Sequence, residues 1–184
     1  MIALMQEFEL TQPVCLVGFM GAGKSSLAGR LARMCMIPAV DMDALIEERS
    51  GRKIAEIFAE SGEAQFRAYE SGLLSELASA APAVISCGGG VVLAAENQQI
   101  LKSSTCVVYL DIGFEEAHKR ISDLSTRPLF ADIEKARELY LQRKPLYEQL
   151  ADICIDSGTK SVNEIALELQ EALLAKGVLC QRQK

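Results

Sequence analysis

The chain has 184 residues and a mass of 20.0 kDa, a size that suits one domain with one hydrophobic core. Hydrophobic residues make up 49% and charged residues 24%, which excludes a disordered chain, a coiled coil and a collagen-like rod. The formal net charge of −6 argues against a general nucleic-acid-binding surface. We therefore expect a single acidic domain over residues 1–184, without a nucleic-acid partner.

The sequence carries no targeting signal that we recognise. Residues 1–10 contain Glu7 and Glu9 but no basic residue, which is atypical of a signal peptide. No stretch approaches the roughly 18 consecutive apolar residues of a membrane-spanning helix. Six cysteines without a CxxC pair are typical of reduced thiols, and a single histidine, His118, argues against a zinc site. These features predict a cytoplasmic protein without a membrane partner.

Short apolar runs alternate with helical patterns along the chain. Five runs are predicted to be buried strands: residues 14–17, 38–40, 83–85, 106–110 and 153–155. Helical spacing of apolar residues occurs over 27–35 and 66–77. The last helix begins with a capping box, Ser161 and Glu164, and Gly177 suits its end. This alternation predicts a three-layer α/β/α fold with a parallel sheet covered on both faces, in which ligands bind beyond the carboxyl ends of the strands.

The first candidate site follows the first predicted strand. Residues 18–25 fit the pattern G-x-x-x-x-G-K-[ST] directly after a strand and directly before a helix. Glycines let backbone N–H groups surround phosphate oxygens, and the helix N-terminus adds positive potential. Lys24 then reaches the β- and γ-phosphates, while Ser25 offers an oxygen to Mg²⁺. The motif predicts an ATP site made of Gly21, Ala22, Gly23, Lys24, Ser25 and Ser26.

Two carboxylates, Asp41 and Asp43, follow the second predicted strand. In an extended segment both would face one cleft, where one could organise Mg²⁺-bound water and the other accept a hydroxyl proton. The alternative is a helix N-cap with an acidic first turn that starts a helix over 44–50. The phosphate-binding motif upstream favours the catalytic interpretation.

Two later motifs each have a functional and a structural interpretation. Arg67 and Glu70 are neighbours on a helix: either an exposed ion pair worth about 0.5 kcal/mol, or a guanidinium held in place for a substrate carboxylate. Gly88, Gly89 and Gly90 end the third strand, where they either form a flexible loop or allow the backbone to approach a ligand closely.

A polar stretch from residue 122 to 144 interrupts the alternation of strands and helices, as lids often do. Arg127 within it would reach a transferring phosphate. Arg143, with Tyr147 one helical turn later, is a further candidate for anion recognition. For either arginine alone, a solvated surface charge is the alternative.

Together these motifs resemble the shikimate kinase family, in family order and over nearly the whole chain: residues 18–25, 41–43, 66–70, 88–90, 127–129 and 143–147. The resemblance implies a P-loop kinase with a five-stranded sheet of order 2-3-1-4-5, like that of the nucleoside monophosphate kinases. It further implies a substrate-binding helical region at about 42–80 and a lid at about 122–134. The implied reaction is transfer of the ATP γ-phosphoryl group to the 3-hydroxyl of shikimate, in aromatic amino-acid biosynthesis. We expect ATP and shikimate as partners, Mg²⁺ as cofactor, and a monomer.

The resemblance also implies roles for individual residues. Lys24, Asp43 and Arg127 are the catalytic residues, and Asp43 contacts the reacting hydroxyl. Shikimate is held by Asp43, Arg67, Gly88, Gly89, Gly90 and Arg143. Arg120 stacks near adenine, Arg127 closes on ATP from the lid, and Asp41 holds Mg²⁺ through water. One departure concerns Ser86 and Cys87, which end the third strand without a carboxylate and leave the Mg²⁺ shell to Ser25, Asp41 and water.

Two other functions are compatible with the phosphate-binding motif. A P-loop kinase for another small polyol, such as gluconate, does not predict the Arg67 and Glu70 motif together with the triple glycine. A non-catalytic nucleotide-binding module leaves Asp43, Arg127 and Arg143 unexplained.

Overall fold

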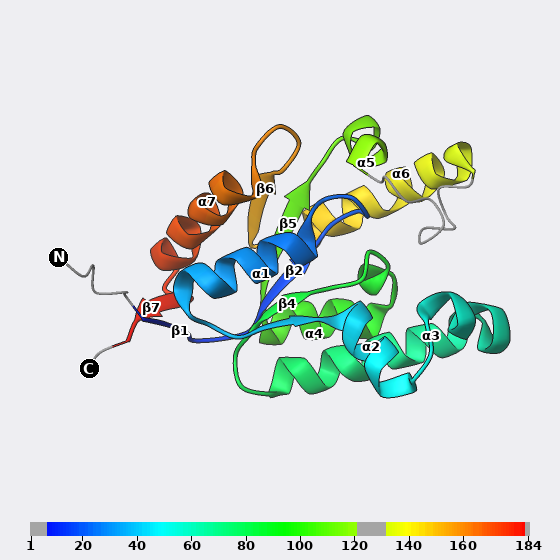
Figure 1. Cartoon of the computed structure of the whole chain (residues 1–184), viewed down its shortest axis with the longest axis horizontal. Coiled ribbons are helices and arrows are strands. Elements are labelled where there is room, and N and C mark those ends of the chain that lie inside the picture. The colour runs from blue at the N-terminus through cyan, green and yellow to red at the C-terminus, as the bar shows by residue number, and fades with distance from the viewer. Residues whose placement is uncertain (1–6, 121–131, 183–184) are drawn as a thin grey trace.

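The computed structural model describes residues 7–120 and 132–182 (Figure 1). The strands are β1 (Phe8–Leu10), β2 (Val14–Val17), β3 (Ala39–Asp41), β4 (Val84–Ser86), β5 (Cys106–Asp111), β6 (Ile153–Asp156) and β7 (Leu179–Gln181). The helices are α1 (Lys24–Cys35), α2 (Met42–Ser50), α3 (Ile54–Ser79), the 3₁₀ turn η1 (Val91–Leu93), α4 (Ala95–Ser104), α5 (Phe114–Arg120), α6 (Ile133–Leu150) and α7 (Val162–Ala175).

Five strands form a parallel sheet in the order β3-β4-β2-β5-β6. Numbered along the chain, this is the predicted order 2-3-1-4-5, so the predicted fold is confirmed. The central strand β2 is buried at all four positions, as expected for a strand covered on both faces. Because β2 lies between β4 and β5, the segments that follow these three strands come together at one edge of the sheet.

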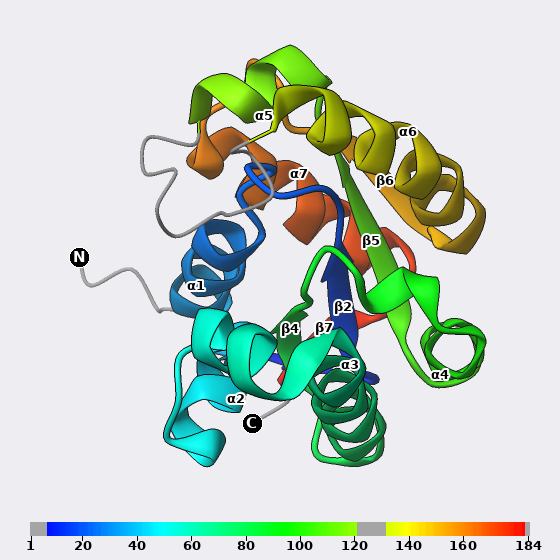
Figure 2. The ribbon, with the colours of Figure 1, turned by 90° about the vertical axis from the view of Figure 1, so that its right-hand side faces the viewer.

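The helices cover both faces of the sheet. Helices α1 and α7 pack against each other on one side, and α3 packs against α4 on the other (Figure 2). The predicted capping box of α7 is present, since Ser161 accepts from the Glu164 N–H and Glu164 accepts from the Ser161 N–H. Gly177 follows α7 at φ 68°, the left-handed conformation expected of it.

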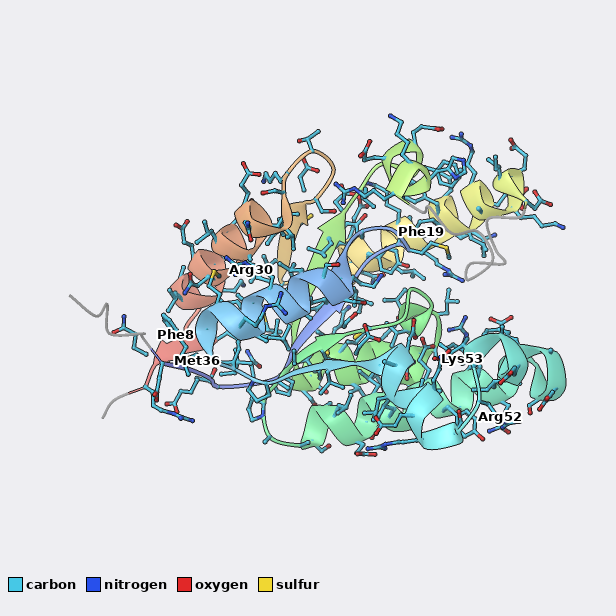
Figure 3. The ribbon with its side chains drawn as sticks, in the orientation of Figure 1. Phe8, Phe19, Arg30, Met36, Arg52 and Lys53 are labelled. Atoms are coloured by element: carbon cyan, nitrogen blue, oxygen red, sulfur yellow. The ribbon has the colours of Figure 1, made fainter. Side chains whose placement is uncertain are left out.

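A second, two-stranded sheet was not predicted. Strand β1 pairs antiparallel with β7, with Phe8 opposite Gln181 and Leu10 opposite Leu179. Each strand has only three residues, and the two lie almost a chain length apart, so no local pattern marks the pairing. In Figure 3 Phe8 of this sheet lies toward one end of the molecule, well apart from Phe19 of the phosphate-binding motif.

Two predicted boundaries change. The extended segment expected at Asp41 to Asp43 is wrong, because α2 already begins at Met42. Residues 132–134 of the predicted lid are the N-cap and first turn of α6, whose N-cap Asp132 accepts from the Lys135 N–H. The remainder of the predicted lid, 122–131, lies outside the described residues. No helix in the described ranges is long and apolar enough to cross a membrane.

Candidate active site

The phosphate-binding motif forms a tight turn between β2 and α1, which we call the phosphate loop (18–25). Gly18 and Gly21 have φ of 143° and 84°, and a Cβ on them would lie 2.7 Å from the Leu110 carbonyl oxygen and 2.6 Å from that of Ala117. Both glycines are therefore required by the packing of the loop against β5 and α5. Lys24 Nζ donates to the carbonyls of Gly18 at 2.8 Å and Phe19 at 3.1 Å, so its ammonium lies over the loop.

An aromatic contact braces the phosphate loop from the side. The buried ring of Phe19 meets Tyr140 of α6 edge-on, with ring centroids 5.3 Å apart, and Phe114 of α5 at 6.4 Å. Edge-to-face pairs of this kind add to the stability gained by burial. Nothing in the motif pattern indicated this contact, since Phe19 occupies one of its variable positions.

Oxygen atoms gather where the phosphate loop meets the neighbouring strands. Ser25 Oγ lies 3.2 Å from Ser86 Oγ at the end of β4, and Asp41 is opposite Ser86 in the strand register. Asp41 also caps α2, because its Oδ1 accepts from the Ala44 N–H at 3.1 Å. The helix-cap interpretation of Asp41 is thus correct, and it occupies one carboxylate oxygen with a backbone bond. Hydroxyl and carboxylate oxygens are ligands that Mg²⁺ prefers, so this donor set fits that ion.

Arg67 and Glu70 form a largely buried ion pair on α3. Arg67 Nη1 donates to Glu70 Oε2 at 2.6 Å, and Glu70 is only 1% exposed. The exposed-pair interpretation is therefore wrong. Burial raises the pKa of Glu70 although the Arg67 charge lowers it, so the net pKa lies above its ordinary value. Glu63 also accepts from Arg67, from Nη2 at 3.1 Å, so two carboxylates orient the guanidinium.

The three glycines after β4, Gly88 to Gly90, form what we call the glycine segment, and charged side chains surround it. A Cβ on Gly88 would lie 2.5 Å from Glu70 Oε1 and 3.1 Å from Asp43 Oδ1. A Cβ on Gly90 would overlap the guanidinium of Arg67, 2.6 Å from Cζ. Asp43 and the Arg67 and Glu70 pair therefore lie together at the glycine segment, and their roles toward a substrate remain predictions.

Every carbonyl of the glycine segment is used by the protein. Gly88 O accepts from the Val91 N–H at 3.1 Å, Gly90 O from the Leu93 N–H at 3.0 Å, and Gly89 O from the Tyr147 hydroxyl at 2.5 Å. Among the described residues, the N–H groups of these three glycines donate to no acceptor. Backbone donors left in this state suit the oxygen atoms of a ligand.

Arg143 approaches the same segment from α6. Its side chain is 4% exposed, and its Nε has no hydrogen-bond partner within the described residues. A Cβ on Gly89 would lie 3.7 Å from Arg143 Nη1. Buried arginines rarely leave a donor without a partner. The unused Nε therefore suits Arg143 to bind an anionic ligand.

Of the two remaining arginines predicted to contact ATP, Arg120 and Arg127, only Arg120 lies within the described residues. Arg120 Nη2 donates to the carbonyls of Ser157 and Gly158, both at 2.6 Å, and so holds the loop that follows β6. Its position at an adenine remains a prediction. Arg127 lies outside the described residues.

The structure also shows the surroundings of Cys87 and His118, two residues with side chains that can be reactive in other proteins. Cys87, next to the glycine segment, is buried, and both the adjacent Cys15 thiol and burial raise its pKa well above the ordinary value, which disfavours the reactive thiolate. His118 lies on α5, where its ring stacks on that of Phe114 with ring centroids 6.5 Å apart.

The fold, a five-stranded parallel sheet between helices, and the phosphate loop define this molecule as a P-loop kinase. Residues 20–174 match the family model of shikimate kinase. The chain belongs to the shikimate kinase family. With this membership it is assigned the activity of that family, ATP-dependent phosphorylation of shikimate in aromatic biosynthesis.

Individual relatives agree with this membership. A shikimate kinase of Dehalococcoides mccartyi is 38% identical over 162 residues, which are 87% of this chain and 92% of that protein. The structure of the Acinetobacter baumannii shikimate kinase in complex with shikimate is similar with a TM-score of 0.85 and 33% identity, covering 90% of this chain and 94% of that one. A gluconokinase from Sinorhizobium meliloti 1021 reaches a TM-score of 0.56 at 16% identity, over 91% of this chain and 98% of that one, and shares the fold alone.

Proposed function

We propose that the chain transfers the γ-phosphoryl group of ATP to the 3-hydroxyl of shikimate, with ATP on the phosphate loop and shikimate on the glycine segment. The observation that carries the proposal is the convergence of Asp43, Arg67 and Arg143 on Gly88 to Gly90. This segment follows β4, which is the direct neighbour of the strand that leads into the phosphate loop. The acceptor and the donor would therefore meet at one edge of the sheet.

The chemical inventory of the glycine segment matches shikimate, which has one carboxylate and three hydroxyl groups. Arg67 and Arg143 offer planar donors for the carboxylate. The free N–H groups of the glycine segment suit hydroxyl oxygens, and Asp43 would accept the proton of the attacking hydroxyl. Glu70 would act through Arg67, whose guanidinium it holds.

On the nucleotide side, positioning and charge do most of the work in phosphoryl transfer. The N–H groups of Gly21, Ala22 and Gly23, the start of α1 with Ser25 and Ser26, and Lys24 would hold the phosphates. Mg²⁺ would be held by Ser25 and, through water, by Asp41, and when bound it would neutralise charge on the phosphates. Arg120 would contact adenine, and Arg127 would stabilise the transferring group.

We further propose that the protein acts as a cytoplasmic monomer. No residue of a second chain is needed to bring Asp43, Arg67 and Arg143 to the glycine segment, because all of them meet there within one chain. Analytical ultracentrifugation at the concentration of the activity assay tests this, and activity that appears only with a dimer would contradict it.

The decisive experiment is a coupled ADP-release assay on the full chain with Mg²⁺ and ATP. Shikimate, gluconate and no acceptor are compared at equal concentration. We expect shikimate to stimulate ADP release strongly over both other reactions. Equal rates with gluconate would indicate a general polyol kinase, and a rate that no acceptor changes would indicate a nucleotide-binding module.

The role of Asp43 is tested with Asp43→Asn, which keeps the shape but removes the proton acceptor. We expect kcat with shikimate to fall by roughly 10²–10⁴, the range for loss of a general base. Glu48→Gln is the matched control, because it makes the same chemical change on the exposed side of the same helix, α2. Near-normal turnover by Asp43→Asn would overturn the assignment.

A further inference from the structure

Tyr147 is the residue that joins the glycine segment to α6. Its side chain is buried at 1% exposure, and its hydroxyl donates to the Gly89 carbonyl. The guanidinium of Arg143, one helical turn earlier, lies beside the same hydroxyl. One phenol thus contacts both the backbone and the arginine to which the proposed function assigns shikimate.

The bond to Gly89 fixes more than one atom. The peptide group is planar, so the Gly89 carbonyl and the Gly90 N–H turn together. Three successive glycines have the greatest backbone freedom of any sequence. The Tyr147 hydroxyl therefore restrains the one peptide of the segment whose carbonyl is not already held by a neighbouring backbone N–H.

Tyr147 is itself held firmly. Its ring stacks on Tyr109 of β5 with centroids 5.4 Å apart and planes 22° from parallel. The Tyr109 hydroxyl donates to Asp111 Oδ1 at 2.7 Å, and Lys144 of α6 donates to the same carboxylate at 2.8 Å. Ring and helix are thus anchored to the same end of β5.

The hydroxyl keeps its proton across the working range of pH. Burial raises the pKa of Tyr147 to about 12, although the neighbouring Arg143 charge lowers it. A phenol that stays neutral remains a donor to the Gly89 carbonyl at every pH at which the enzyme is folded and active.

We propose that Tyr147 is a positioning residue that sets the Gly89–Gly90 peptide and the Arg143 guanidinium in their shikimate-binding arrangement before the substrate arrives. The inference rests on the proposed function, since it assigns the glycine segment to shikimate. It adds a residue that touches no reacting atom and acts on affinity for one substrate only.

The test is Tyr147→Phe, which removes the hydroxyl and keeps the ring. We expect the Kd for shikimate, measured by titration calorimetry without nucleotide, to rise about three- to tenfold, as expected for the loss of one ordering hydrogen bond. The KM for ATP and kcat at saturating shikimate should change by less than about twofold, because the lost contact acts on ground-state binding.

The matched control is Tyr140→Phe. Tyr140 lies on the same helix, and its hydroxyl makes the same kind of bond, to the carbonyl of Ile112 at 3.0 Å. This variant loses an equivalent hydrogen bond away from the glycine segment, so shikimate affinity should stay within about twofold of wild type. An equal rise in Kd in both variants, or equal effects on ATP and shikimate in Tyr147→Phe, would overturn the inference, as would an unchanged Kd.

A second measurement on the wild-type chain does not depend on how well a variant folds. NMR relaxation of the Gly88, Gly89 and Gly90 amides without ligand should give order parameters near those of rigid backbone, about 0.85. Amides that are mobile below about 0.6 and become ordered only with shikimate would contradict prearrangement.

The two proposals fail in different ways. A wild-type chain that binds no shikimate would refute the proposed function and this inference with it. A wild-type chain that binds shikimate, with Tyr147→Phe binding it equally well, would refute the inference alone.

Discussion

The phosphate loop and the glycine segment follow neighbouring strands, and both depend on glycine, but for different reasons. In the phosphate loop, Gly18 and Gly21 have positive φ, and backbone carbonyls occupy the space of a side chain. In the glycine segment no residue has a positive φ of this kind, and Gly90 has φ −98°. There the space of a side chain is filled by Arg67, Glu70 and Asp43.

The glycines of the phosphate loop are therefore required by the fold, whereas those of the glycine segment leave room for the charged side chains of the site. A backbone carbonyl cannot move without moving its strand or helix, whereas the end of an arginine side chain can turn aside. Substitutions in the phosphate loop should therefore affect stability, and those in the glycine segment should affect the position of charged groups. Alanine variants at single glycines test this distinction.

The largest effect is expected from Gly21→Ala. An alanine there is strained at φ 84° and would lie 2.6 Å from the Ala117 carbonyl oxygen. We expect the free energy of unfolding to fall by about 3 kcal/mol or more, from backbone strain of about 1–2 kcal/mol plus the displacement of α5. Urea unfolding followed by circular dichroism measures this loss.

Gly23→Ala is the control for Gly21→Ala. Gly23 has φ 91°, but nothing lies within 4 Å of the position of its Cβ. This variant should lose only the strain contribution, about 1–2 kcal/mol. Equal losses in the two variants would show that the packing of the loop against α5 contributes nothing.

A smaller loss of stability, together with a loss of shikimate binding, is expected from Gly90→Ala. The new methyl group would displace the guanidinium of Arg67, which is the far end of a flexible side chain. We expect shikimate affinity to fall about tenfold or more, equivalent to about 1.4 kcal/mol. Stability should fall as well, because the displaced guanidinium pairs with the buried Glu70 carboxylate, but by less than in Gly21→Ala. Titration calorimetry with shikimate and, separately, with ATP measures both affinities.

Gly72→Ala serves as the reference for this variant, because Gly72 lies on α3 with nothing near the position of its Cβ. It should leave shikimate affinity unchanged. A loss of stability in Gly90→Ala as large as that of Gly21→Ala, with ATP affinity equally reduced, would remove the distinction between the two glycine-rich segments.

The sequence predicts the first segment better than the second, and the reason is physical. The phosphate loop is a local motif, so spacing within eight residues is enough to place its glycines and Lys24 between a strand and a helix. The glycine segment depends on side chains from α2, α3 and α6, and sequence spacing contains no distances between elements. The motifs indicated that Arg67 and Arg143 belong to the site, but not that Glu70 is buried.

Contacts that join distant elements were the least predictable. Ser86 attracted notice only because it is not a carboxylate, yet its hydroxyl meets Ser25. The pairing of β1 with β7 and the contact of Phe19 with Tyr140 join residues more than one hundred positions apart, without charge or periodicity to mark them. Five apolar runs were enough for the parallel sheet because its central strands β2, β4 and β5 are buried at almost every position, which leaves a continuous apolar signal.

The smallest expected effect concerns the end of β5, on which both segments rest. The Leu110 carbonyl lies against Gly18, and the next residue, Asp111, accepts from Lys144 on the helix that carries Tyr147. Partial burial alone would raise the pKa of Asp111, but hydrogen bonds from Lys144 and Tyr109 outweigh it, so the pKa lies below its ordinary value.

A carboxyl whose pKa is lower in the folded than in the unfolded chain stabilises the fold above its unfolded pKa, near 3.9, and the gain is lost as pH falls through the folded pKa. Asp111→Asn should therefore lower the free energy of unfolding at pH 7 by up to about 1 kcal/mol and flatten its decline below about pH 4. Urea unfolding from pH 7 to pH 3 measures both. In a Lys144→Met background the same substitution should have a smaller effect, because the partner charge is gone. Parallel pH curves for wild type and Asp111→Asn would mean that this ion pair does not stabilise the attachment of α6 to the end of β5.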